Sequence, residues 1–527
     1  MLKKILFGFA VMQFIVITGV SAATFEIDSV NDWKNYAKVA KNSTNAVVNI
    51  NEDLNFANEV QSHIDVAKGT VIEGNNHVLS NIKIKELFIR ENYGTIRNLQ
   101  IKNLSATGTD RVGFVAYNRN TMSNINVENV TIRARDRIGF VVENYGTIKN
   151  MRVSNFKLYG RSYVAPIAKN FSYLYDIKTA KGYVVAETFG SGIVGLMHDM
   201  YNKGAYLKLS STDSITLKSK LAEAKKPYRN TPYMGHKKDL KGDFFGGLVG
   251  KNENAIVYGS KANNIAIYAD DALGGAVGYN NFKKYNSKTR TAFVSATHVT
   301  NVTIYGGGKI GGLVGSNNNN NKVNLKQITV KAKGKALRAR ILNSSVKGNL
   351  KIVACINAGG AVGFSNNAYI EGTVVNVNNK PVNVYGSVEE VAGFVGEMEF
   401  GYTRTSRTNA TVKTKGKEVA GFVGDSEGTI VYSHSTSRVY GKNTIAGFVS
   451  SNMGYIGRSS FTGKVYASSG KKGKAVFVGN FSSYKAKAKK YRGYYLKPRY
   501  VKCKSKGSRY VKGKKVKNAF FGTKKGN

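Results

Sequence analysis

The sequence predicts an all-β fold, a right-handed parallel β-helix with an N-terminal cap, loop insertions and a basic C-terminal tail. One observation is a fixed period, because short apolar segments begin every 26 residues and end in asparagine. A second is the pattern inside each period, where aliphatic and β-branched residues alternate with polar ones over short runs bounded by glycine and asparagine. This pattern is typical of strands, whereas helical repeats would contain longer runs of helix formers.

The period is clearest between residues 87 and 181. The apolar segments begin at Leu87, Gly113, Gly139 and Ala165, and they end at Asn92, Asn118, Asn144 and Asn170. Three apolar columns keep the same spacing: Ile96, Met122, Ile148 and Leu174; Leu99, Ile125, Met151 and Ile177; Leu104, Val130 and Phe156. If each unit is one coil of short strands, equivalent positions stack at about 4.8 Å and bury an aliphatic interior.

Polar columns mark the corners of the coils. Asn98, Asn124, Asn150 and Asp176 form one column, and Asn103, Asn129 and Asn155 form another. Asparagine tolerates the left-handed backbone conformation of a sharp corner, and stacked asparagines can hydrogen-bond to one another. We therefore expect ladders of asparagine along the solenoid.

The glycine-led segment returns along the rest of the chain and divides it. It begins at Gly192, Gly247, Gly275, Gly312, Gly360, Gly393, Gly421 and Gly447, and in degenerate form at Val476. We expect residues 24–84 to form the cap and first strands, and residues 85–480 to form the β-helix. Wider gaps predict insertions near residues 197–244, 281–296 and 317–352, the first with a short helix from Ser214 to Lys225. Residues 481–527 are expected to form a basic, weakly ordered tail.

The N-terminus has the features of a secretory signal peptide over residues 1–23. Lys3 and Lys4 precede an apolar run from Ile5 to Val20, which small residues follow. This run is shorter than the roughly 20 residues that cross a bilayer, although a buried helix or an uncleaved anchor remains the alternative. The sequence predicts an exported protein at the cell surface, outside the cell or in the periplasm, with no transmembrane segment after signal cleavage.

Charge is the second informative feature. The chain carries 79 Lys and Arg against 32 Asp and Glu, a formal net charge of +47, and no acidic residue follows Glu427. A basic tail can attach to polyanions, so we expect acidic polymers as partners, such as lipopolysaccharide, an acidic glycan or extracellular nucleic acid. A solubilising terminus is the alternative. The candidate polyanion-binding residues are Lys485, Lys487, Lys489, Lys490, Arg492, Lys497, Arg499, Lys502, Lys504, Lys506, Arg509, Lys512, Lys514, Lys515 and Lys517.

The glycine-led segments also resemble a known repeat. GGLVG occurs at residues 246–250 and 311–315, with the variants GGAVG, AGFVG and GFVSSN elsewhere. These segments resemble the GLUG-type repeat of bacterial exported proteins, and the resemblance covers most of residues 24–480. It implies a β-helical, secreted or surface-displayed protein of the kind found in large adhesin-like polypeptides. Because fold does not determine function, it implies no particular activity.

Enzymatic chemistry is the main alternative. Parallel β-helices include lyases and hydrolases of acidic polysaccharides, and Asp110 with Arg111 is repeated 26 residues later as Asp136 with Arg137. An acid that recurs in successive coils is more typical of a structural ladder than of a catalytic site. Asp270 and Asp271 as a calcium pair are no stronger, and the six histidines lack metal-ligand spacing. We assign no catalytic, metal or cofactor-binding residue, and we expect no cofactor.

The sequence as a whole favours a non-enzymatic exported β-solenoid that is adhesin-like or associated with the envelope. It would attach to anionic polymers through its basic surface and tail. A β-helical polysaccharide lyase or hydrolase that acts on acidic glycans is the first alternative. A secreted nucleic-acid or matrix binder is the second.

Overall fold

A computed structural model gives the fold of the chain. It describes residues 22–199, 204–220, 243–284, 291–320, 339–376, 383–386, 390–414, 416, 418–468, 474–481, 484–485, 495–496, 499–517 and 519–524. Apart from residues 22 and 23, the predicted signal peptide lies outside the described residues. Among the described residues, no helix combines the length and the apolar character needed to cross a membrane.

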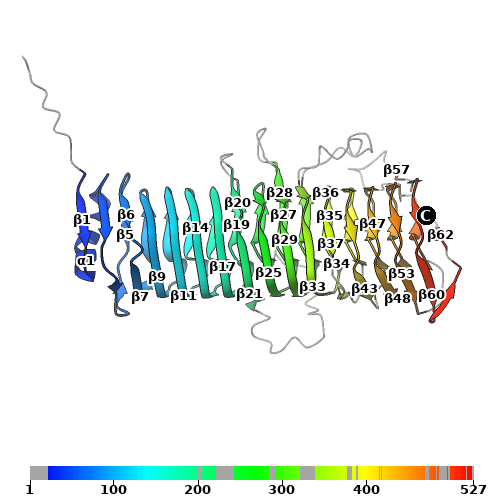
Figure 1. Cartoon of the computed structure of the whole chain (residues 1–527), viewed down its shortest axis with the longest axis horizontal. Helices are drawn as coiled ribbons and strands as arrows, with labels where there is room; N and C mark the ends of the chain where they lie inside the picture. Colours follow the sequence, from blue (N-terminus) through cyan, green and yellow to red (C-terminus); the bar gives the residue numbers. More distant parts are fainter. Residues whose placement is uncertain are drawn as a thin grey trace, which may run out of the picture.

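The molecule is a rod of stacked parallel strands, which confirms the predicted β-helix (Figure 1). Its longest strands are β9 (Thr95–Thr107), β11 (Thr121–Arg133), β14 (Thr147–Tyr159) and β17 (Tyr173–Ala186). These strands pair in register, so that Met122 lies between Ile96 and Ile148 exactly one coil away on either side. The 26-residue period is therefore the length of one coil.

Shorter strands follow the long strand and complete the circuit of the coil. After β11 the chain forms β12 (Asp136–Ile138) and β13 (Val141–Asn144) before β14 begins the next coil. The corners within the long strands fall at the predicted asparagines, since Asn124 and Asn129 have φ angles of 56° and 58°. Left-handed backbone at these residues turns the strand while the ladder with the neighbouring coils continues.

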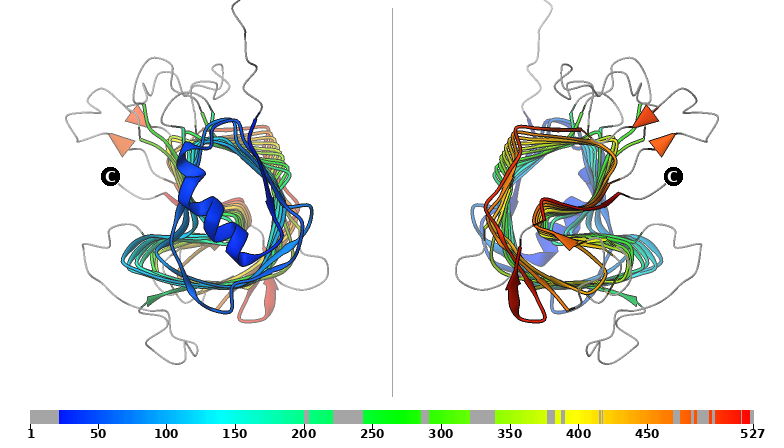
Figure 2. Two further views of the ribbon diagram at one scale, coloured as in Figure 1. Left: turned by 90° about the vertical axis from the view of Figure 1, so that its left-hand side faces the viewer. Right: turned by 90° about the vertical axis from the view of Figure 1, so that its right-hand side faces the viewer.

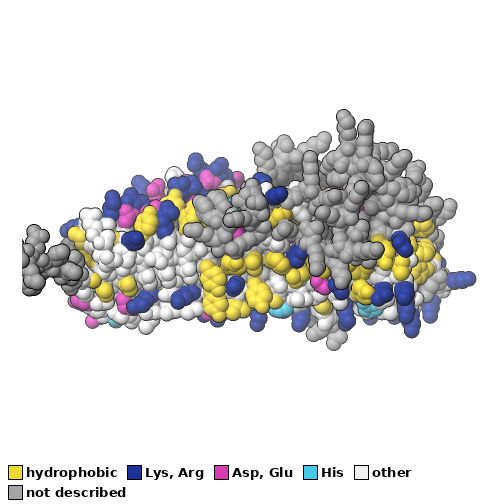
Figure 3. All heavy atoms as spheres, turned by 90° about the horizontal axis from the view of Figure 1, so that it is seen from above, with side chains coloured by type: hydrophobic (Ala, Val, Ile, Leu, Met, Phe, Trp, Pro, Cys, Tyr) yellow, Lys and Arg dark blue, Asp and Glu magenta, His cyan; other side chains and the backbone are white. Residues whose placement is uncertain are grey.

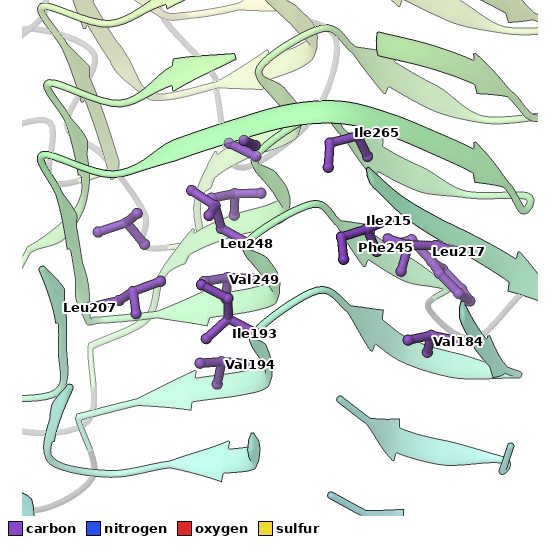
Figure 4. Packing of buried hydrophobic residues seen from close by; sticks show 14 of the residues in the cluster. Val184, Ile193, Val194, Leu207, Ile215, Leu217, Phe245, Leu248, Val249 and Ile265 are labelled. Atoms are coloured by element: carbon purple, nitrogen blue, oxygen red, sulfur yellow. The ribbon is translucent and has the colours of Figure 1, made fainter. Parts of the chain in front are cut away.

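The interior is a continuous column of apolar side chains along the rod. Figure 4 shows part of it, where aliphatic residues of successive coils point toward one another. Aromatic rings stack in the same way in the C-terminal half: Phe394, Phe422, Phe448 and Phe477 have successive centroid distances of 4.7, 4.8 and 4.9 Å. Such pairs add roughly 0.5–1.5 kcal/mol beyond the burial of their area.

The glycine at the start of each apolar segment has a steric cause. A Cβ atom at Gly113 would lie 2.0 Å from the carbonyl oxygen of Gly139, and one at Gly275 would lie 2.1 Å from that of Gly312. The backbone of the following coil occupies the space that a side chain would need. The recurring glycine therefore reflects close approach of two coils.

A helix lies across the N-terminal end of the rod (Figure 2). It is α1 (Val30–Val39), which follows β1 (Thr24–Ile27), and the Ser29 side chain accepts a hydrogen bond from the Asp32 amide at its start. Trp33 on α1 is buried and stacks on Phe88 of the first coils, with centroids 5.4 Å apart. The helix thus keeps the end of the apolar column from water, as a solenoid terminus requires.

The C-terminal part of the rod corrects the predicted boundary at residue 480. Residues 499–524 contain a further coil: β58 (Arg499–Val501), β59 (Lys504–Ser505), β60 (Ser508–Val511) and β62 (Phe521–Lys524) pair in parallel with strands of the preceding coil. β61 (Lys514–Val516) folds back antiparallel on β60. The sequence of this last coil is rich in outward-pointing lysines, and for this reason its strand pattern could not be recognised from the sequence alone.

The bounds of all three predicted insertions also need correction, since β28 (Ala292–Ser295) lies within residues 281–296 and pairs with β24 (Ile256–Tyr258). β20 (Tyr206–Lys208) and β21 (Ser211–Ser219) lie within residues 197–244 and continue the coil from β17, so the predicted helix is wrong over residues 214–219. Thr212, Ile215 and Leu217 of β21 are buried. Similarly, β33 (Ser345–Ala354) overlaps the region predicted as residues 317–352 and pairs with β29 (His298–Tyr305), with a register shift between Thr300 and Val302. Residues 221–242, 285–290 and 321–338 lie outside the described residues.

Candidate functional site

The predicted polyanion-binding residues fall into two groups. Nine of them lie on the last coil and its hairpin: Arg499, Lys502, Lys504, Lys506, Arg509, Lys512, Lys514, Lys515 and Lys517. Lys485 is described only through its backbone, in β56 (Tyr484–Lys485). Lys487, Lys489, Lys490, Arg492 and Lys497 lie outside the described residues.

Most of the nine described cations point into solvent. Lys502, Lys504 and Lys506 are exposed on and beside β59, and Lys512 and Lys514 are exposed on either side of the β60–β61 turn. Lysine ammonium groups in this position keep their charge available to a ligand. The last coil therefore presents a set of exposed positive charges.

Arg509 is different from the others. It pairs in register with Val465, which belongs to the apolar column, and its guanidinium donates a hydrogen bond to the Lys517 carbonyl oxygen at 2.8 Å. An arginine at this column position ties the end of the rod to the hairpin. Its contacts are those of a structural residue at the solenoid terminus.

The preceding coils extend the basic surface. Arg438 on β48 (Arg438–Gly441) and Lys464 on β53 (Lys464–Ala467) are paired in register and are both exposed. Sequence reasoning missed these two residues because they lie before residue 481, although their spacing equals one coil. Most of the acidic side chains visible in Figure 3 belong to the N-terminal half, on the left of the view. No acidic residue follows Glu427, so the last coils contribute no carboxylates to this basic surface.

A groove of about 690 Å³ lies on these coils. It crosses β43 (Thr411–Thr414), β48, β53 and β60, whose labels lie beside one another at the lower right of Figure 1. Three tyrosines form its floor: Tyr440, Tyr466 and Tyr510 pair in register from coil to coil. Three lysines also line it, Lys413, Lys442 and Lys512, and no described lining residue is acidic.

The tyrosines form a tight ladder. The Tyr440 and Tyr466 ring centroids are 4.5 Å apart with an interplanar angle of 4°, and the values for Tyr466 and Tyr510 are 5.0 Å and 15°. Burial, together with the neighbouring Tyr466, raises the pKa of the Tyr440 hydroxyl. This hydroxyl is consequently a neutral hydrogen-bonding group at physiological pH.

The repeated Asp and Arg residues near the N-terminus form an ion-pair ladder. Asp110 and Asp136 are paired in register. The Arg137 guanidinium binds the Asp110 carboxylate, and Arg161 binds Asp136 in the same way one coil further on, with Nη2 and Oδ2 2.7 Å apart. Each carboxylate is occupied by an arginine of the next coil, which is the arrangement of a structural ladder. Within the described ranges, no three His, Cys, Asp or Glu side chains are placed to hold a metal ion.

Comparison with known proteins bears on the N-terminal coils. Residues 27–140 match the profile of the pectate lyase-like adhesive domain family. No curated protein and no solved structure matched the chain significantly. The match covers the cap and the first coils, together with the beginning of the Asp and Arg ladder, and it supports an adhesin-like β-helical protein.

Proposed function

We propose that this protein is a non-enzymatic, exported, adhesin-like β-solenoid that attaches to anionic polymers through the basic surface of its C-terminal coils. The observation that carries the proposal is the charge of these coils, because the 100 residues after Glu427 contain 24 Lys and Arg and no Asp or Glu. The described cations among them include exposed lysines on successive strands. The adhesive family matched by residues 27–140 and the resemblance of the glycine-led segments to the GLUG-type repeat support the same conclusion.

The physical basis of this attachment is the positive electrostatic potential of the C-terminal coils, which attracts an anionic polymer. Exposed like charges spaced along a rigid rod attract a polymer of opposite charge over about 8–10 Å at physiological salt. Each contact is weak when it is exposed, but a polymer meets many contacts at once, so binding is multivalent. Attachment of this kind weakens as the salt concentration rises.

The test uses the mature chain from residue 24 on immobilised lipopolysaccharide, acidic glycans, DNA and neutral glycans at low and high salt. We expect retention on acidic polymers at low salt and loss of retention at high salt. The triple variant Lys502→Glu, Lys504→Glu and Lys506→Glu should lose most of this retention. Its matched control reverses three exposed lysines of the N-terminal coils, Lys83, Lys85 and Lys102.

Three outcomes would overturn the proposal. The first is no retention on any acidic polymer at low salt. The second is an equal loss in the control variant, which would assign the effect to net charge alone. The third is the appearance of shortened or unsaturated products from uronate-containing glycans, because such products would identify the protein as a polysaccharide-cleaving enzyme.

A further inference from the structure

The groove on the C-terminal coils has a more specific geometry than a basic surface needs. Its tyrosine ladder, Tyr440, Tyr466 and Tyr510, runs along the rod with one ring per coil. Coils are spaced by about 4.8 Å. Whatever lies along this ladder therefore meets the same contact at each step of that length.

Cations flank the ladder on both sides. Arg438 and Lys464 stand two residues before Tyr440 and Tyr466, at a distance of about 7 Å along the strand. On the other side, Lys442 and Lys512 stand two residues after Tyr440 and Tyr510 and line the groove, and Ser468 holds this place on the coil between them. The result is an aromatic floor between two rows of positive charge.

The stacking of the rings decides which polyanion fits. Because the Tyr440 and Tyr466 rings lie parallel at 4.5 Å, no nucleobase can enter between them, and the inner faces of the ladder are closed. Proteins that bind single-stranded nucleic acid generally offer open aromatic faces on which bases stack. This ladder offers ring edges and hydroxyl groups instead. Ring edges carry partial positive charge, and hydroxyl groups exchange hydrogen bonds with sugar hydroxyls.

We propose that the groove over Tyr440, Tyr466 and Tyr510 binds a linear acidic polysaccharide with one carboxylate on each sugar residue. The polymer runs along the long axis of the rod, because a pyranose residue in an extended chain is about as long as one coil spacing, ~4.8 Å. Carboxylates two sugar residues apart meet the ammonium groups of Lys442 and Lys512, which lie two coils apart. This inference rests on the proposed function and names the class of polymer and the place where it binds.

The experiment measures binding of fluorescently labelled oligogalacturonate to the mature chain at low salt. The methyl-esterified oligomer, which lacks the charge, and single-stranded oligothymidylate are compared with it. The groove variants are Tyr466→Ala and the pair Lys442→Gln with Lys512→Gln. The matched controls are Tyr258→Ala, at an exposed tyrosine far from the groove, and the pair Lys83→Gln with Lys85→Gln, at exposed lysines of the N-terminal coils. Unchanged thermal midpoints show that each variant is folded.

We expect the oligogalacturonate to bind, its methyl ester not to bind, and each groove variant to raise the Kd about tenfold, which corresponds to 1.4 kcal/mol. The control variants should change the Kd less than about twofold. Groove variants that leave the Kd unchanged, as the controls should, would overturn the groove and leave the proposed function intact. Tighter binding of oligothymidylate that the groove variants weaken would overturn the choice of a glycan. Failure to bind any polyanion would overturn this inference and the proposed function together.

Discussion

The side-chain amide of Asn118 donates a hydrogen bond to the side-chain oxygen of Asn144 at 2.7 Å, and both residues are fully buried. The two are one coil apart, and the same bond joins Asn92 to Asn118 and Asn144 to Asn170. Each of Asn118, Asn144 and Asn170 also donates to a backbone carbonyl two residues ahead. The ladder therefore satisfies buried backbone at the turn of each coil as well as the amides themselves.

Replacing the central amide should be costly. In the variant Asn144→Ala, the Asn118 amide loses its acceptor in the next coil, and the Asn170 side-chain oxygen loses one of its two donors. The Gly146 carbonyl keeps only the Tyr173 amide at 3.4 Å. Three hydrogen bonds of this buried ladder are lost, and each contributes about 0.5–1.5 kcal/mol net, so we expect a loss of about 2–4 kcal/mol in the free energy of unfolding. Urea unfolding followed by circular dichroism measures it. Asn126→Ala, at an exposed position of β11, is the control, and equal midpoints would contradict the prediction.

The steric account of the glycine-led segments gives a second prediction. In Gly275→Ala the new methyl group would lie 2.1 Å from the Gly312 carbonyl oxygen, so the two coils must move apart. We expect a loss of about 1–3 kcal/mol or more in the free energy of unfolding. The control is Gly513→Ala, because Gly513 has a φ of 78° and no atom within 4 Å of a Cβ, and it should cost only about 1 kcal/mol. A smaller effect at Gly275 than at Gly513 would contradict the steric account.

Much of the fold could be predicted because one coil repeats almost without change between residues 87 and 181. The register of Ile96 with Met122 and the left-handed backbone at Asn124 both follow from the 26-residue period. The prediction failed where the period is interrupted. Residues 214–225 were predicted as a helix, although Ile215 and Leu217 alternate with polar residues as a strand requires.

The candidate site was less accessible to sequence reasoning. The last coil was missed because lysines dominate its composition, while its pairing depends on a few inward residues such as Tyr500, which lies opposite Ile456. The groove was missed because it is assembled from four coils. Tyr466 and Tyr510 are adjacent in the ladder but are separated in the sequence by a segment longer than one coil, so no fixed spacing reveals the ladder.

Acidic groups of the C-terminal half should make stability depend on pH. Burial, and then the nearby carboxylate of Glu399, raises the pKa of Glu427 to about 7. In the unfolded chain this pKa is near 4.3, so the folded state holds a proton that the unfolded state has released between these values. Stability is therefore greatest below the unfolded pKa and falls as the pH rises toward 7.

The variant Glu427→Gln isolates this effect. It keeps the shape of the side chain and removes the ionisation, so its stability relative to the original protein should rise between pH 5 and pH 8. We expect a gain of about 1–2 kcal/mol, since partial exposure of the carboxylate screens the full effect. Thermal unfolding across this pH range measures it, with Glu52→Gln at an exposed position as the charge-matched control. A difference in stability between Glu427→Gln and the original protein that stays the same at every pH would contradict the prediction.

One corner residue leaves room for stabilisation. Leu209 follows β20 with a φ of 48°, and the equivalent position in other coils is held by Gly259 and Asn343. Left-handed backbone costs roughly 1–2 kcal/mol for most residues and less for asparagine. Leu209 is 48% exposed, so its replacement gives up only about half of the burial of a core leucine. We therefore expect Leu209→Asn to raise the free energy of unfolding by about 1 kcal/mol, measured by thermal unfolding. Leu209→Val, which keeps an apolar side chain and adds β-branching, should lower it, and the reverse order would show that contacts of the leucine outweigh the backbone strain.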